Sequence, residues 1–405
     1  MQNSEPYSPR SSHPPGQPRT ILIGVTHPQT CLVLSARLRT LRESGFRVLL
    51  VSSPGELLDS TASREGVDRI AIPMQRGIAP FADLISLWRL WRLLEDRRPN
   101  LVEFSTPKAG LLGSLAARLC GVPRRVYMLR GLKVEGSAGI KRSLLLATER
   151  LASACAHVVL CNSESLRDQA VALGVAPRSK LRVLGEGSSN GVDIERFSPG
   201  PDQVRNRLGI PHDAKVVGFV GRLTCDKGLP ELVDAFDVIL RARPCARLLL
   251  VGWFDAAEDA LSQELRTRIL RHPGIDCTGF VTDTAPYYRA MDVLVLPSWR
   301  EGFPNAVLEA AASGVPVVTT ECTGARDSVV PEVTGLLIPP GYPEAISEAV
   351  LKIISDPALQ RRMGCAARAW IVDHYLESRV LGLTADYYRR FLDAPVGTPL
   401  QGTEA

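Results

Sequence analysis

Two glutamates, Glu301 and Glu309, stand eight positions apart in the segment LPSWREGFPNAVLEAA, residues 296–311. Glu301 follows an apolar run that predicts a buried strand, and Glu309 lies inside the helix predicted next. Gly302 and Pro304 break the chain between them, and Pro304 suits the first turn of that helix. Carboxylates so placed can accept hydrogen bonds from hydroxyl groups such as those of a ribose. The structural alternatives are a helix-dipole contact for Glu301, worth about 0.3–1 kcal/mol, and an exposed helix position for Glu309.

The backbone between the two glutamates is a second candidate binding element. The first N–H groups of a helix have no partner within the helix, so they attract hydroxyl or phosphate oxygens of a ligand. We therefore expect the amides of this turn to point toward the same site as the glutamates. The residues concerned are Gly302, Phe303, Pro304, Asn305 and Ala306.

Two cations occur in the segment GFVGRLTCDKGLPELV, residues 218–233. Gly221 allows the chain to turn after a predicted strand, and the loop then carries Arg222 and Lys227. Gly228 precedes a helix whose free N–H groups favour an anion, so a diphosphate is the ligand that this loop suits. A surface loop with solvated charges is equally consistent with the segment taken alone.

Three further polar residues are candidates for a binding site in the first half of the chain. Thr106 and Lys108 begin a helix after a predicted strand in STPKAGLLG, where they could meet a pyrophosphate. An N-terminal cap and a surface lysine are the simpler interpretations. His27 lies in the loop GVTHPQT after the first predicted strand, although a loop histidine is more often only solvated.

The elements that must position these residues are short apolar runs alternating with amphipathic segments. Gly45 ends one helical segment, and a second one is opened by Pro107 and closed by Gly121. Such alternation predicts parallel, doubly wound sheets, with ligands bound beyond the carboxyl ends of the strands. The predicted strands cover 20–25, 46–53, 101–105, 125–129, 157–163 and 181–185, and then 215–221, 246–252, 275–280, 292–298, 316–320 and 335–339.

The alternation pauses once, which predicts an α/β protein of two Rossmann-like domains facing each other across a cleft. The Gly-, Ser- and Pro-rich stretch 185–203 fits a linker between them. We expect one Rossmann-like domain over 19–190 and a second over 191–374. The last helices, about 375–395, are expected to pack back on the first domain. Residues 1–18, rich in Pro and Ser, are expected to be a disordered tail and not a signal peptide.

Composition narrows the function classes. The formal charge of +5 over 405 residues does not by itself indicate nucleic-acid binding, and the nine cysteines form no Cys-x-x-Cys pair. Reduced thiols indicate a cytoplasmic protein, and a chain without an apolar run of about 18 residues could meet a membrane only peripherally.

The excess of basic over acidic residues lies in the first half of the chain. Residues 84–150 contain thirteen Lys or Arg against five acids. A solvated face is the interpretation we favour over attraction to an anionic membrane or to a phosphorylated acceptor. The predicted helix LISLWRLWRLLEDRRP leaves the same choice, because Trp88 and Trp91 could contact lipid headgroups, whereas core packing of a crossover helix explains the pattern more simply.

Together, GRLTCDKG and EGFPNAVLE resemble the retaining family 4 glycosyltransferases of the GT-B fold. The resemblance extends over 105–131, 187–197 and 287–318. It implies an acceptor-binding first domain, for which His27, Thr106 and Lys108 are the candidate residues, and a nucleotide-sugar-binding second domain. In the second domain, Arg222 and Lys227 would neutralise the diphosphate leaving group, Glu301 would accept a hydrogen bond from the transferred sugar, and Glu309 would bind the ribose. It also implies no metal or other cofactor, and the chain has no Asp-x-Asp motif. Retention without an enzymic nucleophile implies front-face attack assisted by the departing phosphate.

The chain departs from the family at Arg130. Many members place a histidine before the glycine at this point, whereas this chain has YMLRGLK. Because arginine stays protonated, its role would shift toward binding the donor phosphate or an acidic acceptor.

The function predicted is transfer of a hexose or N-acetylhexosamine from a UDP-sugar to a sugar acceptor. Similar Thr-Pro-Lys-Ala-Gly segments in the family favour a polyprenyl-diphosphate-linked acceptor in exopolysaccharide, capsule or envelope synthesis. A soluble acceptor such as an aminoglycoside is the nearest alternative. A nucleotide-sugar epimerase and a non-catalytic nucleotide-sugar-binding partner remain open as other classes.

Overall fold

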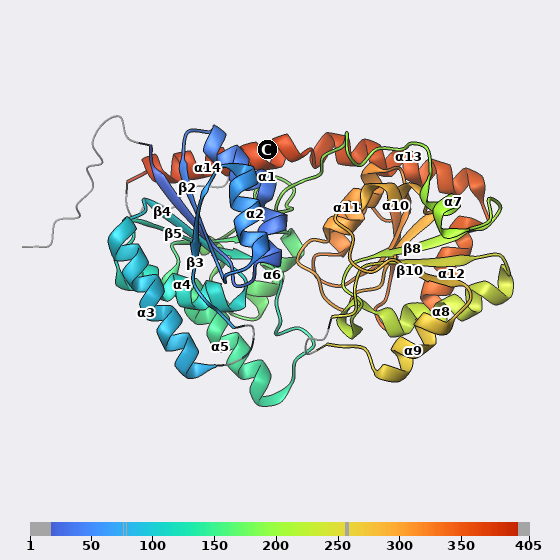
Figure 1. Cartoon of the computed structure of the whole chain (residues 1–405), viewed down its shortest axis with the longest axis horizontal. Coiled ribbons are helices and arrows are strands. Elements are labelled where there is room, and N and C mark those ends of the chain that lie inside the picture. The colour runs from blue at the N-terminus through green and yellow to red at the C-terminus, as the bar shows by residue number, and fades with distance from the viewer. Residues whose placement is uncertain (1–17, 76, 78, 256–258, 396–405) are drawn as a thin grey trace, which may run out of the picture.

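The computed structural model describes residues 18–75, 77, 79–255 and 259–395. Figure 1 shows two α/β units side by side, the first coloured blue to green and the second yellow to orange. The predicted fold of two Rossmann-like domains is confirmed. The predicted disordered tail, residues 1–18, lies outside the described residues except for its last position.

The first sheet has seven strands in the order β3-β2-β1-β4-β5-β6-β7, and neighbouring strands pair in parallel. The order reverses between β1 and β4, which opens a crevice beyond their carboxyl ends. The strands are β1 (Thr20–Gly24), β2 (Arg47–Ser52), β3 (Asp68–Ala71), β4 (Leu101–Ser105), β5 (Arg124–Leu129), β6 (Val158–Cys161) and β7 (Leu181–Arg182). Its helices are α1 (Gln29–Glu43), α2 (Glu56–Glu65), α3 (Pro80–Arg97), α4 (Pro107–Leu119), α5 (Gly139–Cys155), α6 (Glu164–Ala172) and η1 (Arg178–Lys180).

The second sheet repeats this topology with six parallel strands in the order β10-β9-β8-β11-β12-β13. Its crevice lies between β8 and β11, the two strands that the candidate cations and glutamates follow. The strands are β8 (Val216–Val220), β9 (Arg247–Val251), β10 (Ile275–Cys277), β11 (Val293–Leu296), β12 (Val317–Thr320) and β13 (Gly335–Ile338). Its helices are α7 (Val204–Leu208), η2 (Cys225–Lys227), α8 (Leu229–Ala242), α9 (Gln263–Arg271), α10 (Ala285–Arg289), α11 (Asn305–Ala312), η3 (Arg326–Ser328), α12 (Pro343–Ile354) and α13 (Pro357–His374).

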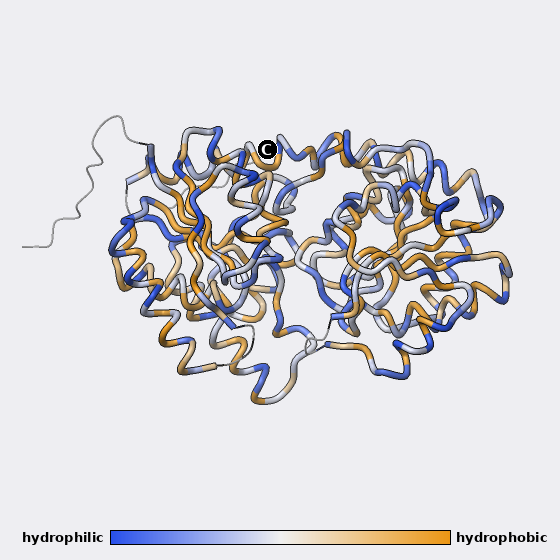
Figure 2. The backbone as a smooth tube through the Cα atoms, viewed as in Figure 1, coloured by the Kyte–Doolittle hydropathy of each residue, from blue (hydrophilic) through white to orange (hydrophobic). Residues whose placement is uncertain are grey.

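The strands form because their apolar runs are buried on both faces by helices. The central strands β1, β4, β8 and β11 are buried almost throughout. Figure 2 shows these runs in orange inside each unit, with hydrophilic residues in the loops and on the outer helix faces. Burial of apolar side chains is the main favourable contribution to folding. Because helices cover both faces of each sheet, only the ends of the strands remain open to a ligand.

The last helix, α14 (Glu377–Asp393), returns to the first sheet and packs against α1. A buried polar cluster ties it there. Arg37 of α1 donates to Glu103 of β4 at 2.6 Å and to the Tyr388 hydroxyl of α14 at 2.8 Å, and that hydroxyl also bonds Glu103. All three side chains are buried, so the cluster fixes α14 behind the strands that end at the cleft.

The structure differs from the sequence-based expectations at several element boundaries. The edge strand β3 was not predicted, because its residues are mostly exposed and carry two charges. The runs at 181–185 and 275–280 form strands of only two and three residues. Pro304 is the residue before the first turn of α11 and not within that turn, with φ −79° and ψ 110°. The extended conformation of Pro304 still delivers the chain from Glu301 to α11.

Candidate active site

Residues from both sheets line one pocket of about 210 Å³ between the carboxyl edges of the strands. The pocket joins the loops after β4 and β5 to the loops after β8 and β11, as the crevice rule for parallel sheets predicts. Its lining residues are Thr106, Pro107, Tyr127, Arg130, Gly131, Leu132, Lys133, Arg222, Asp226, Lys227, Arg300, Glu301 and Gly302. Six predicted site residues therefore meet here: Thr106, Arg130, Arg222, Lys227, Glu301 and Gly302.

An ion pair between Lys227 and Glu301 forms the centre of the pocket's second-domain side. The ammonium of Lys227 lies 2.5 Å from Oε1 of Glu301, and the Ser298 hydroxyl donates to the same oxygen at 2.7 Å. Both charged side chains are largely buried. The close approach of the two loops requires Gly228, where φ is +71° and a Cβ would lie 2.1 Å from the Pro297 carbonyl oxygen. The loop after β8 is thereby clamped to the loop after β11.

The second cation, Arg222, belongs to a wider charge network around Asp226. Arg222 lies 3.1 Å from Asp255 and 3.5 Å from Asp226, and Arg300 lies 3.1 Å from Asp226 and 2.9 Å from Asp259. Burial alone would raise the pKa of Asp226, but the Thr224 hydroxyl and the surrounding cations outweigh burial and hold this pKa below its usual value. The network therefore fixes two arginines beside Lys227, and a field of positive charge faces the pocket.

The backbones of the two domains touch at Gly302. A Cβ at this residue would lie 1.9 Å from the Arg130 carbonyl oxygen, so only glycine fits. Several side-chain contacts join the domains nearby: the Thr323 hydroxyl lies 2.6 Å from Glu135, the Ser165 amide donates to Asp327 at 2.9 Å, and the Gly324 amide donates to the Ser165 hydroxyl at 2.8 Å. These contacts hold the first-domain side of the pocket against the Glu301 turn.

Arg130 presents a cation from the first domain. Its Nη1 donates to the Ser189 hydroxyl at 3.1 Å, while Nε and Nη2 are buried without a hydrogen-bond partner among the described residues. Burial, together with the nearby charge of Arg37, lowers the pKa of Arg130 to about 10. The guanidinium is still charged at neutral pH, so it can bind an anion but cannot act as a base.

The three candidate acceptor residues take different places. Thr106 lines the pocket with φ +71°, a strained conformation for a β-branched residue, and its hydroxyl lies 2.7 Å from that of Thr26. It does not cap α4 with its side chain. Lys108 turns away to α3, where its ammonium lies 2.6 Å from Asp83. His27 is half-buried beside α1, and the Gln29 amide donates to its Nδ1 at 3.3 Å.

Glu309 lies on α11, outside the residues that line the pocket. The Tyr288 hydroxyl donates to its Oε2 at 2.8 Å, and the Thr284 hydroxyl lies 3.4 Å from the same atom. Burial raises the pKa of Glu309 to about 7. The carboxyl group is thus held by two hydroxyl groups of the second domain.

The turn before α11 supplies backbone groups and little else. Across the crevice from this turn, Gly221 follows the end of β8 with φ +154°, and the chain turns there toward Arg222. The Phe303 side chain is buried and packs against Tyr375, with ring centroids 5.4 Å apart, so only its amide can serve a ligand. Asn305 and Ala306 begin α11 and are half-buried.

Several pocket residues were not predicted from the sequence. Arg300 and Asp226 stand directly beside Glu301 and Lys227, so their neighbours were the available signal. Tyr127 and Lys133 flank Arg130 at a distance of three residues each. Ser298, which donates to Glu301 but does not line the pocket, ends the apolar run and carries no signal of its own. The described part of the chain contains no group of three or more His, Cys, Asp or Glu side chains able to hold a metal ion.

Two family models match the chain in succession. The model described as "Glycosyl transferase 4-like domain" matches residues 34–187, and "Glycosyl transferases group 1" matches residues 214–356. Each match falls on one of the two sheets, and the Arg222–Glu301 pocket side lies within the second.

Whole-chain relatives agree with these matches. The capsular polysaccharide biosynthesis glycosyltransferase CapM of Staphylococcus aureus is 33% identical over 92% of this chain and 97% of its own. The UDP-Gal:alpha-D-GlcNAc-diphosphoundecaprenol alpha-1,3-galactosyltransferase of Escherichia coli is 28% identical over 70% of this chain and 74% of its own. The crystal structure of HepE from Anabaena in complex with UDP and glucose superposes with a TM-score of 0.78 at 20% identity, covering 92% of this chain and 100% of that one, which shows the fold alone. The chain therefore belongs to the family 4 type glycosyltransferases of the GT-B fold.

Proposed function

We propose that this glycosyltransferase retains the anomeric configuration of a sugar that it transfers from a UDP-sugar, a hexose or N-acetylhexosamine, to a sugar carried on a polyprenyl diphosphate. The observation that carries the proposal is the single pocket in which Arg222, Lys227 and Glu301 of one domain face Thr106 and Arg130 of the other. The relatives named for capsular polysaccharide and for a diphosphoundecaprenol acceptor support a role in capsule or exopolysaccharide assembly.

The donor would lie against the second domain, with its diphosphate between Arg222 and Lys227. Preorganised cations stabilise negative charge where it develops on the leaving diphosphate, and this is usually the largest single contribution to catalysis. The pair with Glu301 keeps the Lys227 ammonium in place before the donor arrives. Glu301 can then accept a hydrogen bond from a hydroxyl group of the transferred sugar, and the Glu309 carboxylate can accept hydrogen bonds from the ribose hydroxyl groups.

The chemistry proposed needs neither a metal nor another cofactor. The acceptor hydroxyl attacks the anomeric carbon on the face from which the phosphate departs, and its proton passes to a departing phosphate oxygen. The positive charges of the pocket would assist by holding that oxygen. Arg130 and Thr106 lie on the acceptor's side, where a guanidinium suits the acceptor's phosphate better than a base would.

A cytoplasmic site at the inner face of the membrane fits a lipid-linked acceptor. Within the described ranges, no helix combines the length and the apolar character that crossing a bilayer requires. Contact with the membrane would therefore be peripheral in this proposal.

The experiment that tests the proposal is mass spectrometry of products formed by the purified protein. UDP- and GDP-sugars are each offered with a lipid extract containing polyprenyl-diphosphate sugars. We expect a product one hexose or N-acetylhexosamine heavier that extracts into organic solvent and forms with a UDP-sugar. A product in the aqueous phase would favour a soluble acceptor such as an aminoglycoside, and a free epimer formed without an acceptor would favour an epimerase.

A non-catalytic nucleotide-sugar-binding role is separated by one variant. Glu301→Ala should abolish polymer production in the host pathway if the protein transfers sugar. Unchanged production in that variant would instead favour a binding partner.

A further inference from the structure

An exposed apolar stripe runs along the first half of α3. Phe81, Leu84, Ile85 and Trp88 are 86%, 63%, 52% and 58% exposed, and their spacing of three and four residues places them on one helix face. Side chains of this size gathered on one face mark an interaction surface, whereas scattered ones do not. Trp91 is less exposed than Trp88: it is half-buried and packs with the core under α3. The two interpretations of this helix therefore apply to different tryptophans.

A second apolar pair stands on α5. Ile140 and Leu144, one turn apart, are 90% and 47% exposed. Helices α3 and α5 pack on opposite sides of α4, and their N-terminal ends both lie along the lower edge of the first domain in Figure 1. We name the six residues on these two helices the α3–α5 surface.

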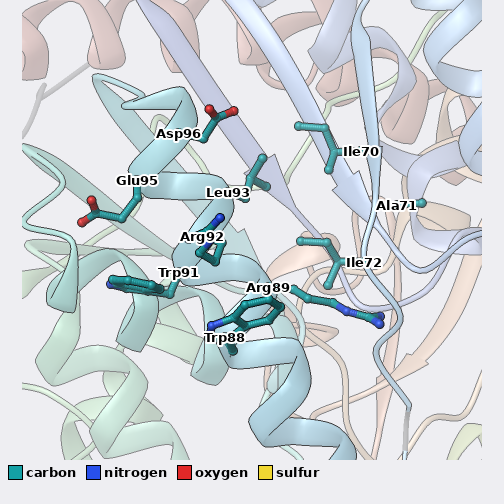
Figure 3. A pocket seen from close by; sticks show the side chains of 10 residues that line it. All are labelled: Ile70, Ala71, Ile72, Trp88, Arg89, Trp91, Arg92, Leu93, Glu95 and Asp96. Carbon is teal, nitrogen blue, oxygen red and sulfur yellow. The ribbon is translucent and has the colours of Figure 1, made fainter.

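A groove of about 610 Å³ adjoins the α3–α5 surface between α3 and the edge strand β3. Figure 3 shows Ile70 and Ile72 on the strand side, with Leu93 and Trp88 reaching toward them from the helix. Trp88 belongs to both the stripe and the groove. The apolar area on α3 is therefore continuous from Phe81 to the floor of the groove.

Both signs of charge occur around this surface, and the arginines supply its positive part. Arg89 and Arg92 line the groove together with Glu95 and Asp96, and Arg142 lies two residues after Ile140 on α5. None of these three arginines forms an ion pair with a residue that the structure describes. The Arg92 guanidinium lies over the Trp88 ring, 5.9 Å from its centroid. An apolar stripe bordered by unpaired arginines and a tryptophan complements the interface of an anionic bilayer.

The surface lies close to the acceptor side of the pocket. Asp83, between Phe81 and Leu84 on α3, pairs with Lys108 at 2.6 Å, and Lys108 is two residues from the pocket residue Thr106. A bilayer resting on the stripe would therefore bring lipid headgroups near the entrance through which a lipid-linked acceptor must arrive.

We infer that the α3–α5 surface docks the enzyme on an anionic phospholipid bilayer, with the apolar side chains inserted among the headgroups and Arg89, Arg92 and Arg142 bound to phosphates. This inference rests on the proposed lipid-linked acceptor for its role in catalysis. Its physical basis is the surface itself, so binding to a bilayer can be tested without the transfer reaction.

The test is co-sedimentation of the full chain with vesicles of phosphatidylglycerol and phosphatidylcholine, compared with pure phosphatidylcholine vesicles. The variant Leu84→Glu/Ile85→Glu should lower the partition coefficient on anionic vesicles by about tenfold or more, since each side chain loses its apolar burial and faces like charge. The control Leu270→Glu changes an equally exposed leucine, 59%, on α9 of the other domain and should bind as wild type. The variant Arg89→Glu/Arg92→Glu should weaken binding severalfold and reduce its sensitivity to salt.

Binding of UDP and transfer to a short-chain, water-soluble acceptor are measured in parallel. Both should be unchanged in the α3 variants, which also shows that they fold. Wild-type protein that ignores anionic vesicles, or an α3 variant that binds them like wild type, would overturn the inference. A dimer in solution that these variants dissociate, without vesicle binding, would assign the surface to a second copy and also overturn it. Vesicle binding without transfer to any lipid-linked acceptor would leave the docking surface in place and refute the proposed function.

Discussion

The two sides of the pocket hold their charges differently. On the second-domain side, Lys227 is paired with Glu301, and Arg222 and Arg300 are paired with aspartates. On the first-domain side, Arg130 has a single hydroxyl partner, and two of its nitrogens are buried without one among the described residues. The second-domain side is built before any ligand binds, whereas the first-domain side has donors that remain to be satisfied.

This difference agrees with the proposed function, in which the second-domain side binds the donor and the first-domain side binds the acceptor. A diphosphate leaving group develops charge during the reaction, so its cations must be fixed in advance to avoid reorganisation. An acceptor contributes its own oxygens, which can complete the hydrogen bonds of Arg130 when it binds. Four experiments would break or sharpen this contrast, and they are described from the largest expected effect to the smallest.

Removing either member of the Lys227–Glu301 pair should have the largest effect. Each of Lys227→Ala and Glu301→Ala is expected to lower kcat/KM for transfer by about 10²–10³-fold, because the diphosphate or the sugar loses a preorganised contact. The double variant should fall short of the product of the two losses, since the residues share one interaction. Steady-state kinetics measure kcat/KM for each variant. The control is Lys352→Ala, which removes an exposed ion pair with Glu332. Full additivity would contradict a preorganised pair.

Arg130→Ala should affect the acceptor and spare the donor. The loss of charged hydrogen bonds worth about 1.5–3 kcal/mol is expected to raise the acceptor KM by about tenfold to hundredfold. The dissociation constant of UDP, measured by calorimetry, should stay within about twofold of wild type, because Arg130 lies on the other side of the pocket from the proposed donor site. Arg271→Ala, on the exposed α9, serves as the matched control. A larger change in UDP affinity than in acceptor KM would reverse the assignment of the two sides.

Donor binding should depend on pH through Glu309. Because burial raises its pKa to about 7, the carboxyl group proposed to bind the ribose is mostly protonated at pH 6 and mostly ionised at pH 8. UDP should therefore bind about tenfold more weakly at pH 6 than at pH 8.

The contribution of Glu309 to folding stability changes with pH in the opposite direction from its contribution to UDP binding. The raised pKa of Glu309 contributes stability that is complete below pH 4.5 and is lost as the pH rises through about 7. Glu309→Gln should remove the pH dependence of UDP binding. Glu149→Gln, which changes a carboxyl whose pKa is also raised to about 7 by burial but in the first domain, should retain it. A pH dependence that persists in Glu309→Gln would assign it to another group.

Tyr388→Phe should have the smallest effect on activity and act through stability. Its hydroxyl bonds both Arg37 and Glu103 inside the first domain, so its loss is expected to cost about 1–3 kcal/mol in the free energy of unfolding. Urea denaturation measures this, with the exposed Tyr342→Phe as control. UDP affinity should not change, because α14 supports only the first-domain side. A loss of UDP affinity would show that the two sides are coupled.

Much of the fold was predictable because it follows from local patterns. Apolar runs buried on both faces and helices bounded by residues such as Pro107 and Gly121 predicted nearly every strand of both sheets. The exception, β3, pairs at a sheet edge with exposed residues, so no apolar run marks it. The site was predictable where its residues follow strands directly, as Arg222, Arg130 and Glu301 do.

Partners far apart in the sequence were not predictable. Lys227 and Glu301 are separated by 74 residues, and Arg37 and Tyr388 by 351. Lys108 was expected at the acceptor and instead pairs with Asp83, because α3 passes beside the start of α4. The face of α3 that remains exposed likewise depends on which helix packs against it.

The sequence by itself determined two doubly wound sheets and the polar residues at their carboxyl edges, because strand period, helix punctuation and loop position are local properties of the chain. Only the tertiary structure decided which charges neutralise one another, how deeply Glu309 and Arg130 are buried, and which apolar side chains remain on the surface. Those outcomes depend on distances across the assembled sheets, and distance and burial set the energy of a charge or an apolar group.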